Sequence, residues 1–286
     1  MISLRRGAVS LDIAPARGGG VLRFDVGGQA IFAAVRGPAP EDMACVPLLP
    51  FANRIANGRF AADGQPVTLS LHADEPHALH GTGWTRAWTP ADCGPDSAEL
   101  HVECAAGDGG WPWAWHGWQR YALTDDGYRH SIALSNRGNT PMPAGIGLHP
   151  WLPRNALTRY HGLHRQEWQP GPDQLPGVCR GAATPIDWWQ SAAVGTRQVD
   201  CCYAGRDGAL RVDWPDRRLT LAIHPDPVFA FTQVYVPDAD FFCVEPVSHL
   251  PDAVNRGGDI GLRWLAPGET LAGTVVFRVS RGANAG

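Results

Sequence analysis

The chain has no lysine, and all 24 of its basic residues are arginine. The missing amine excludes Schiff-base chemistry, covalently attached pyridoxal phosphate, a lysine general base and the lysine of a phosphate-binding P-loop. The Walker A, G-x-S-x-G and dinucleotide-binding glycine patterns are also absent. Neither nucleotide binding of these kinds nor a serine nucleophile on an elbow is therefore indicated.

Long apolar runs and cysteine frameworks are missing as well. No apolar run reaches the length of a membrane span, and Asp12 interrupts the short apolar patch after Arg5 and Arg6, so we expect no secretory signal. The seven cysteines form no C-x-x-C pair and no disulfide framework, which is typical of a reducing compartment and predicts a cytoplasmic protein. A net charge of −4 with scattered arginines predicts no nucleic-acid or membrane partner.

The pattern along the chain is that of a β protein. Amphipathic helical stretches are absent, while 34 glycines and 25 prolines punctuate almost every segment. Residues 124–127 and 215–217 have the composition of tight turns between strands. Many short strands at regular spacing predict an all-β, antiparallel sandwich or barrel with little helix. The expected strands are 8–13, 21–26, 67–71, 100–104, 120–123, 128–134, 211–214, 219–223, 229–236 and 274–279.

Few segments depart from this pattern. One short helical turn is expected at 184–191, with Pro185 at its first position. The Pro/Gly-rich segment 162–185 is expected to be a long excursion, and the glycines at 18–20 a tight turn before a strand. No composition shift or flexible linker divides the chain, so we expect a single domain over residues 1–286.

A carboxylate at the end of an apolar strand is the most unusual local feature. Residues 241–244 are apolar and predict a buried strand, which leads directly into Glu245 and Pro246. Because proline cannot donate a ladder hydrogen bond, strand pairing is expected to stop at Pro246. A buried ionised carboxylate is costly unless it is paired. Two interpretations stay open, a salt bridge to an arginine and a general base that faces a polar pocket.

A histidine follows two alternating glycines. In a strand, Gly145, Gly147 and His149 face the same side, and the two missing side chains predict open space in front of an imidazole. A ligand site needs such space. Trp111, Trp113 and Trp115 also alternate, and we expect them to belong to the core rather than to a sugar-binding platform.

Three further polar sites have both a structural and a functional interpretation. Arg54 lies among small and apolar residues, where its guanidinium either ties loops together or binds a ligand. His77 and His80 have the spacing of two metal ligands, but no third or fourth ligand follows at a familiar distance. Asp200 enters a strand of small residues and, taken alone, is an N-cap or loop residue.

Taken in order, these motifs resemble the aldose 1-epimerase (galactose mutarotase) family, from about Gly18 to Phe277. The segment after Glu245, residues 252–255, also looks like the corresponding segment of the family. The motifs are Asn53-Arg54-Ile55, His80-Gly81-x-x-Trp84, Gly147-x-His149-Pro150, Asp200-x-Cys202 and Glu245-Pro246.

The resemblance implies a large antiparallel β-sandwich, the galactose mutarotase-like supersandwich, and a cofactor-free isomerase that interconverts the α and β anomers of a free aldose. By motif match, Glu245 would be the general base and His149 the general acid. His80, placed with this catalytic group, would orient sugar hydroxyls together with Arg54 and Asp200. Asn53 and Trp84 complete the expected substrate-binding set. The partner would be a small sugar, and the protein would be a monomer or a homodimer.

Other functions remain open at this stage. The chain departs from the family at residues 149–152, where His-Pro-Trp-Leu stands in place of the frequent His-Pro-Tyr-Phe, and this departure can change sugar preference. One alternative is a hexose-phosphate 1-epimerase of the same superfamily. A non-catalytic carbohydrate-binding β-sandwich is another, and a metalloenzyme that uses His77, His80 and His149 is a third.

Overall fold

The computed structural model describes residues 1–72 and 75–282. Almost all of its regular structure is β, as the sequence predicts, and an 18-stranded antiparallel sheet dominates it. The strands are β1 Ile2–Arg6, β2 Val9–Ala14, β3 Gly20–Val26, β4 Gln29–Ala30, β5 Cys45–Leu48, β6 Arg54–Ile55, β7 Arg59–Ala62, β8 Gln65–Thr68, β9 Ala78–Leu79, β10 Thr89–Cys93, β11 Ser97–Cys104, β12 Trp115–Leu123, β13 Gly127–Asn136, β14 Met142–Ala144, β15 Gly147–Pro153, β16 Arg159–Pro170, β17 Pro176–Asp187, β18 Val199–Ala204, β19 Asp207–Trp214, β20 Leu219–Pro225, β21 Phe231–Val236, β22 Phe241–Val247, β23 Arg263–Leu265 and β24 Thr270–Arg281.

Helical structure within the described ranges is limited to single 3₁₀ turns, and no helix there is long and apolar enough to cross a membrane. The turns are Pro40–Asp42, Ala56–Gly58, Gly83–Thr85, Asp108–Gly110, Val194–Thr196, Pro215–Arg217 and Ala253–Asn255.

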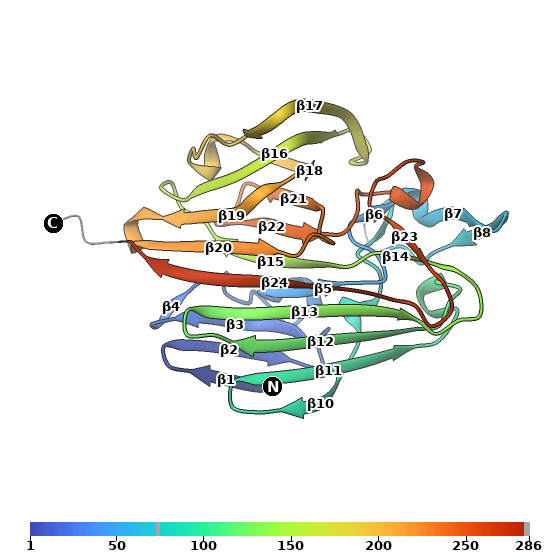
Figure 1. Cartoon of the computed structure of the whole chain (residues 1–286), viewed down its shortest axis with the longest axis horizontal. Coiled ribbons are helices and arrows are strands. Elements are labelled where there is room, and N and C mark those ends of the chain that lie inside the picture. The colour runs from blue at the N-terminus through green and yellow to red at the C-terminus, as the bar shows by residue number, and fades with distance from the viewer. Residues whose placement is uncertain (73–74, 283–286) are drawn as a thin grey trace.

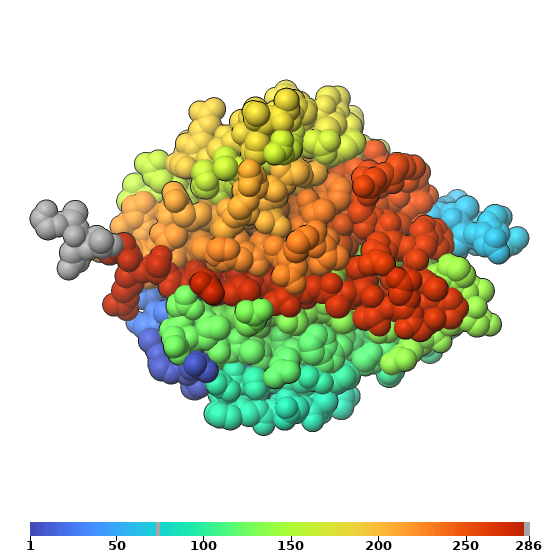
Figure 2. Space-filling view, viewed as in Figure 1, coloured from blue at the N-terminus to red at the C-terminus, as the bar shows by residue number. Residues whose placement is uncertain are grey.

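The large sheet folds over itself as two ladders that share β16. The first ladder runs β10-β11-β12-β13-β24-β20-β19-β16-β17, and the second runs β1-β2-β3-β5-β15-β22-β21-β18-β16. In Figure 1, strands of both ladders are seen one in front of the other from the bottom of the picture to the top. In Figure 2, β24 forms a red band across the middle of the visible face, between green and orange strands of the first ladder.

The main core lies between the two ladders. Strands of the first ladder alternate buried and accessible positions, as in β12, because one face packs inward and the other meets solvent. Aromatic rings join the layers. Phe24 of β3 packs edge-on against Tyr128 of β13, with ring centroids 4.8 Å apart, and Tyr128 stacks on Phe277 of β24. Trp111, Trp113 and Trp115 lie in this core, as predicted.

Strands β15 and β22 differ because both of their faces are covered. Six of the seven residues of each strand are buried. Leu148 and Val244 belong to the main core, whereas Trp151 and Cys243 belong to a smaller apolar cluster on the other face. A strand pair that is buried on both sides can hold a polar side chain away from bulk water.

The segment 162–187 is regular structure, so two predictions about it are wrong. The expected excursion at 162–185 is the long hairpin of β16 and β17. The helical turn expected at 184–191 is also absent, because β17 continues to Asp187 and only then does the chain turn. The proline at the start of the supposed helix lies in an extended strand instead. Pairing with β16 overrides the local helix signal.

The prediction that strand pairing stops at Pro246 is wrong as well. Strand β22 continues through Pro246 to Val247, with Thr232 opposite Pro246. The ladder to β15 has no pairs between Cys243 and Val247, and a residue without an N–H donor is tolerated where pairing is already open.

The glycines before His149 do not leave open space. Gly145 precedes β15, and a Cβ atom there would collide with the imidazole of His249. A Cβ at Gly147 would lie 2.8 Å from Val247. The strand expected at 67–71 lies earlier in the chain, because β8 begins at Gln65, ends at Thr68 and pairs with β7.

Gly145 should tolerate no larger residue. Its neighbour His249 is buried and fixed on both sides, since Nε2 accepts from the Ala52 N–H and Nδ1–H donates to the Leu250 carbonyl. We expect Gly145→Ala to lower the free energy of unfolding by about 1–3 kcal/mol through overpacking, measured by chemical denaturation. The control is Gly181→Ala, where a Cβ meets nothing within 4 Å and the change should stay within about 0.5 kcal/mol. Equal effects at both positions would contradict the collision.

Candidate active site

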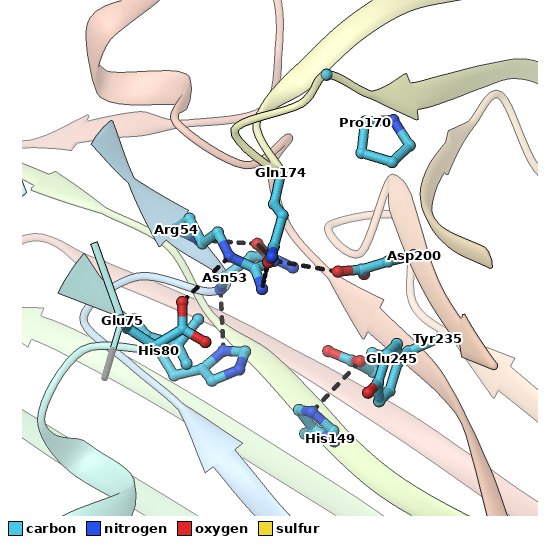
Figure 3. Close-up of a pocket in the computed structure, with 12 residues that line it drawn as sticks. Asn53, Arg54, Glu75, His80, His149, Pro170, Gln174, Asp200, Tyr235 and Glu245 are labelled. Atoms are coloured by element: carbon cyan, nitrogen blue, oxygen red, sulfur yellow. Dashed lines mark hydrogen bonds and ion pairs between the residues drawn. The ribbon is translucent and has the colours of Figure 1, made fainter. Parts of the chain in front are cut away.

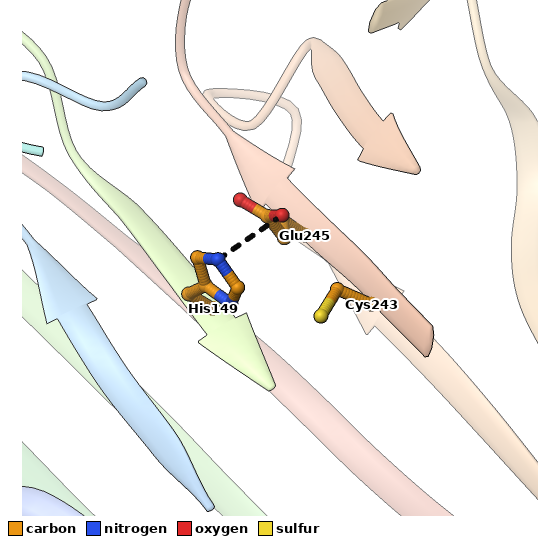
Figure 4. A group of neighbouring side chains, drawn as sticks. All are labelled: His149, Cys243 and Glu245. Carbon is orange, nitrogen blue, oxygen red and sulfur yellow. Dashed lines mark ion pairs between the residues drawn. The ribbon is translucent and has the colours of Figure 1, made fainter. Parts of the chain in front are cut away.

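Glu245 and His149 face each other on neighbouring strands. In the ladder between β15 and β22, Gly147 pairs with Val247 and Trp151 with Cys243, so His149 falls opposite Glu245 between these pairs. The His149 Nε2 atom is 3.4 Å from the Glu245 Oε1 atom. Figure 4 shows the two side chains pointing toward one another between the strands. The sequence-predicted acid and base are therefore brought together.

Glu245 is almost completely withdrawn from water. The residue is 2% exposed, and its Oε2 atom has no hydrogen-bond partner among the described residues. Burial raises the pKa of the Glu245 carboxyl well above its usual value, and the negative charge of Asp200 raises it further, whereas the Arg54 guanidinium lowers it. Arg54 thus favours the ionised form, as expected, but burial is the larger effect.

His149 is buried in the same region and leans on an aromatic face. Its ring stacks on Trp151 with a centroid separation of 4.0 Å. Burial lowers the pKa of His149 to about 3, because a desolvated imidazolium is less stable than the neutral ring. The opposite directions for Glu245 and His149 favour a neutral pair with one proton between the two groups.

His80 lies next to this pair. It occupies a left-handed backbone conformation with φ of 60°, and its Nδ1 atom accepts a hydrogen bond of 3.1 Å from the Asn53 N–H. The neutral ring must then carry its proton on Nε2. The rings of His80 and His149 meet edge to face at 5.2 Å, and burial lowers the pKa of His80 well below its usual value. His80 is therefore a fixed neutral donor.

Arg54 links three separate segments at the rim of the site. Its guanidinium donates to Asp200 of β18 at 3.2 Å and to Gln174 of the β16–β17 loop at 2.6 Å, and it lies 3.7 Å from Glu75. Asn53 accepts from the Arg54 backbone N–H. Figure 3 shows Arg54 between Gln174, Asp200 and Glu75, above His149 and Glu245. Arg54 thus ties loops together and also faces the pocket.

Asp200 is held inside a strand, not at a helix cap or in a loop. It pairs with Tyr235 across β18 and β21, and its carboxylate accepts from the side-chain amide of Gln233. Gln233 in turn lies opposite Glu245. The strand order β18-β21-β22 therefore sets the spacing between the two carboxylates.

These side chains surround a pocket of about 560 Å³, a size typical of small-molecule sites. Six of the seven predicted site residues line it, and Trp84 lines an adjoining chamber of about 260 Å³ with Trp151. His80 and His149 border both spaces. The predicted residues in the larger pocket are Asn53, Arg54, His80, His149, Asp200 and Glu245.

Several lining residues were not predicted from the sequence, among them Glu75, Gln174 and Tyr235. Tyr235 lies in a predicted strand, and alternation from Gln233 could have indicated it. Gln174 carries no local signal, since only the return of the β16–β17 hairpin brings it to the pocket.

His77 has a structural task. Its Nδ1 atom accepts from the Asn57 N–H at 3.0 Å, and its Nε2–H donates to the Asp173 carbonyl at 2.8 Å. Both ring nitrogens are engaged, and the ring anchors the β16–β17 loop. The alternative metal site of His77, His80 and His149 is therefore not supported by the geometry.

Comparison with known proteins gives a consistent result. Residues 1–278 match the family model described as aldose 1-epimerase. The chain is 31% identical to the uncharacterized protein YphB of Escherichia coli K12 over 83% of this chain and 84% of that protein.

Solved structures are similar over almost the whole chain. A candidate aldose 1-epimerase from Escherichia coli K12 has a TM-score of 0.89 with 27% identity, covering 98% of both chains. A galactose mutarotase-like protein from Clostridium acetobutylicum has a TM-score of 0.87 with 16% identity, covering 98% of this chain and 94% of the other.

The burial of the Glu245 carboxyl should lower the free energy of unfolding at neutral pH. Because its folded pKa is raised, the folded protein keeps a proton that the unfolded chain releases above roughly pH 4.3. Stability is therefore lost as the pH rises through this window. We expect Glu245→Gln to match wild type near about pH 4 and to exceed it by about 0.5–2 kcal/mol near about pH 8, measured by denaturation at each pH. The control, Glu103→Gln at a 71% exposed side chain, should show no such divergence. A constant difference for Glu245→Gln would refute the raised pKa.

Proposed function

The chain belongs to the aldose 1-epimerase family, and we propose that it interconverts the α and β anomers of a free aldose. The reaction opens a cyclic hemiacetal and closes it again on the other carbonyl face. A base must remove the proton of the C1 hydroxyl while an acid protonates the ring oxygen. The required residues are one carboxylate and one imidazole.

The observation that supports this proposal most strongly is the separation of 3.4 Å between Glu245 and His149 at one side of the pocket. The C1 hydroxyl oxygen and the ring oxygen are bonded to the same carbon atom. A base and an acid that act on them together must therefore lie close to one another, within hydrogen-bond reach of neighbouring oxygens. A structural salt bridge would not need to face a pocket.

In the proposed cycle, Glu245 accepts the C1 hydroxyl proton and His149 gives its proton to the ring oxygen. The C1–O5 bond breaks with its electron pair on O5, and the open-chain aldehyde forms. Rotation about C1–C2 presents the other face of the carbonyl group. The hydroxyl then attacks that face, and each proton transfer is reversed, so that both side chains return to their initial state.

A single proton shared by the pair is sufficient for this cycle. Burial favours the neutral carboxyl and neutral imidazole. Transfer of the Glu245 proton to His149 gives the carboxylate and imidazolium without a change of total charge. Arg54 favours this charged arrangement because it lowers the pKa of Glu245. Both arrangements hold the same number of protons, so the pair titrates as a unit.

The polar rim suits sugar hydroxyls. Arg54 and the Nε2–H of His80 are donors, and Asp200 and Glu75 are acceptors. We assign these groups to substrate orientation, with Asn53 holding both Arg54 and His80. Trp84 contributes an apolar wall of the adjoining chamber.

The decisive experiment is polarimetry of a freshly dissolved α-aldose. We expect Glu245→Gln to remain folded and to lose about 10²–10⁴-fold in catalysed mutarotation, because the amide cannot accept the hydroxyl proton. The control Glu103→Gln changes an exposed carboxylate and should keep wild-type activity. Near-normal activity of Glu245→Gln would remove it from the mechanism. Sugar binding by wild type without any acceleration would favour a non-catalytic carbohydrate-binding protein.

Charge favours an uncharged sugar over a sugar phosphate. The residues lining the pocket in the described ranges include one arginine, Arg54, and it is already bonded to Asp200 and Gln174. Glu75, Asp200 and Glu245 add three carboxyl groups to the same pocket. A phosphate dianion would meet no unpaired cation there and would be repelled.

We therefore expect kcat/KM for glucose to exceed that for glucose 6-phosphate by at least about tenfold, which corresponds to roughly 1.4 kcal/mol of discrimination. Both substrates are compared by the same coupled anomer assay at equal ionic strength. Equal turnover of the phosphate ester would instead support the hexose-phosphate 1-epimerase alternative.

A further inference from the structure

Cys243 lies directly beside the acid–base pair. One ligand atom each from His149, Cys243 and Glu245 can be chosen so that all three lie within 4.8 Å of one another, and all three residues are buried. Figure 4 shows Cys243 on the same strand as Glu245, with its thiol directed toward the neighbouring strand that carries His149. The proposed reaction gives this cysteine no task.

The cluster has unused bonding capacity. The Glu245 Oε2 and His149 Nδ1 atoms are buried without a hydrogen-bond partner within the part of the chain that the structure describes. Buried polar atoms are normally satisfied. A thiol, an imidazole and a carboxylate are together the donor set that zinc prefers.

The distances are close to those of a coordination site. An ion at the centre of a triangle whose sides are at most 4.8 Å lies within about 2.8 Å of each corner. Side-chain shifts of roughly 0.5–0.8 Å would reach the usual zinc–ligand lengths of about 2.0–2.3 Å. Because His149 and Glu245 line the pocket, an entry path from solvent exists, and a fourth coordination position can face the pocket.

We propose that His149, Cys243 and Glu245 form a binding site for a thiophilic divalent cation of the zinc class. An ion at this site would bind the two side chains that the proposed reaction uses, His149 and Glu245, so its occupancy blocks catalysis reversibly. The inhibitory effect rests on the proposed function, whereas the binding itself does not.

The net charge of the occupied site is compatible with its burial. A thiol binds such an ion as a thiolate, so the ion must displace the thiol proton of Cys243. Binding releases the protons of Cys243 and Glu245 to solvent, and the resulting thiolate and carboxylate neutralise the dication. Affinity should therefore increase with pH. Mg²⁺ prefers oxygen ligands and should not bind.

The test measures binding and activity in one background. Cys93 and Cys179 are exposed and could bind metal on their own, so both are first changed to serine. We expect this protein to bind one equivalent of Zn²⁺ by titration calorimetry and to show a thiolate-to-metal charge-transfer band when Co²⁺ is used instead. Zn²⁺ should inhibit mutarotation, with recovery after a chelator is added, and Mg²⁺ should have no effect.

Cys243→Ala in the same background supplies the discriminating variant. It should keep mutarotase activity, lose the Co²⁺ charge-transfer band and weaken Zn²⁺ binding by more than the roughly 10–100-fold that loss of an outer-shell partner costs. Cys201→Ala, at a buried cysteine outside the cluster, is the matched control and should bind Zn²⁺ like its parent.

The outcomes separate the two proposals. Absence of Zn²⁺ binding, or unchanged binding by Cys243→Ala, overturns the metal site. If Cys243→Ala does not fold, the Co²⁺ spectrum of the parent protein tests the metal site instead. A missing charge-transfer band would exclude a thiolate ligand and overturn the site. Stoichiometric binding through Cys243 in a protein that accelerates no mutarotation, with or without metal, would support the site and refute the proposed function.

Discussion

Removal of water from one carboxylate, Glu245, is the physical constraint on which the rest of this structure depends. A carboxylate on an exposed strand would be ionised and solvated, and would be a weak base. Here the strand that carries it is covered on both faces, by the main core on one side and by a smaller apolar cluster on the other. Burial raises the pKa of Glu245, and the same burial lowers the pKa of His149. This common environment favours a proton shared between the two side chains.

The remaining polar residues act around this dry centre. Arg54 is the hub, because one guanidinium reaches β18, the β16–β17 loop and Glu75. Its planar fork suits such multiple contacts better than a lysine amine would, in a chain that has no lysine at all. His77 and its bond to the Asp173 carbonyl hold the hairpin loop over the site. The rim is thus held together by contacts between several segments and is polar in its side chains, which suits the proposed binding of sugar hydroxyl groups.

Much of the fold was predictable from local patterns, because strands with one solvated face alternate along the sequence. Strands β12 and β13 and the turn at 124–127 are examples. Local patterns failed where tertiary contacts override local preference. Strand β17 occupies part of the segment expected to be helical, and β22 continues through Pro246. The space beside Gly145 is filled by His249. The motif residues that gather in the pocket were indicated by their order in the chain. Gln174 and Glu75 could not be found in this way, since no local pattern shows which loop returns to the pocket.

The assembly of Arg54 with Asp200 also has a consequence for folding. These two residues are 146 positions apart, and the pairing of Gly147 in β15 with Val247 in β22 joins residues that are 100 positions apart. Loops this long make pairing slow compared with local contacts. The pocket cannot be completed before β22 has been synthesised, because Glu245 lies on this late strand. A chain that shows activity has therefore completed its long-range pairing, and recovery of activity after denaturation would report the end of folding rather than its beginning.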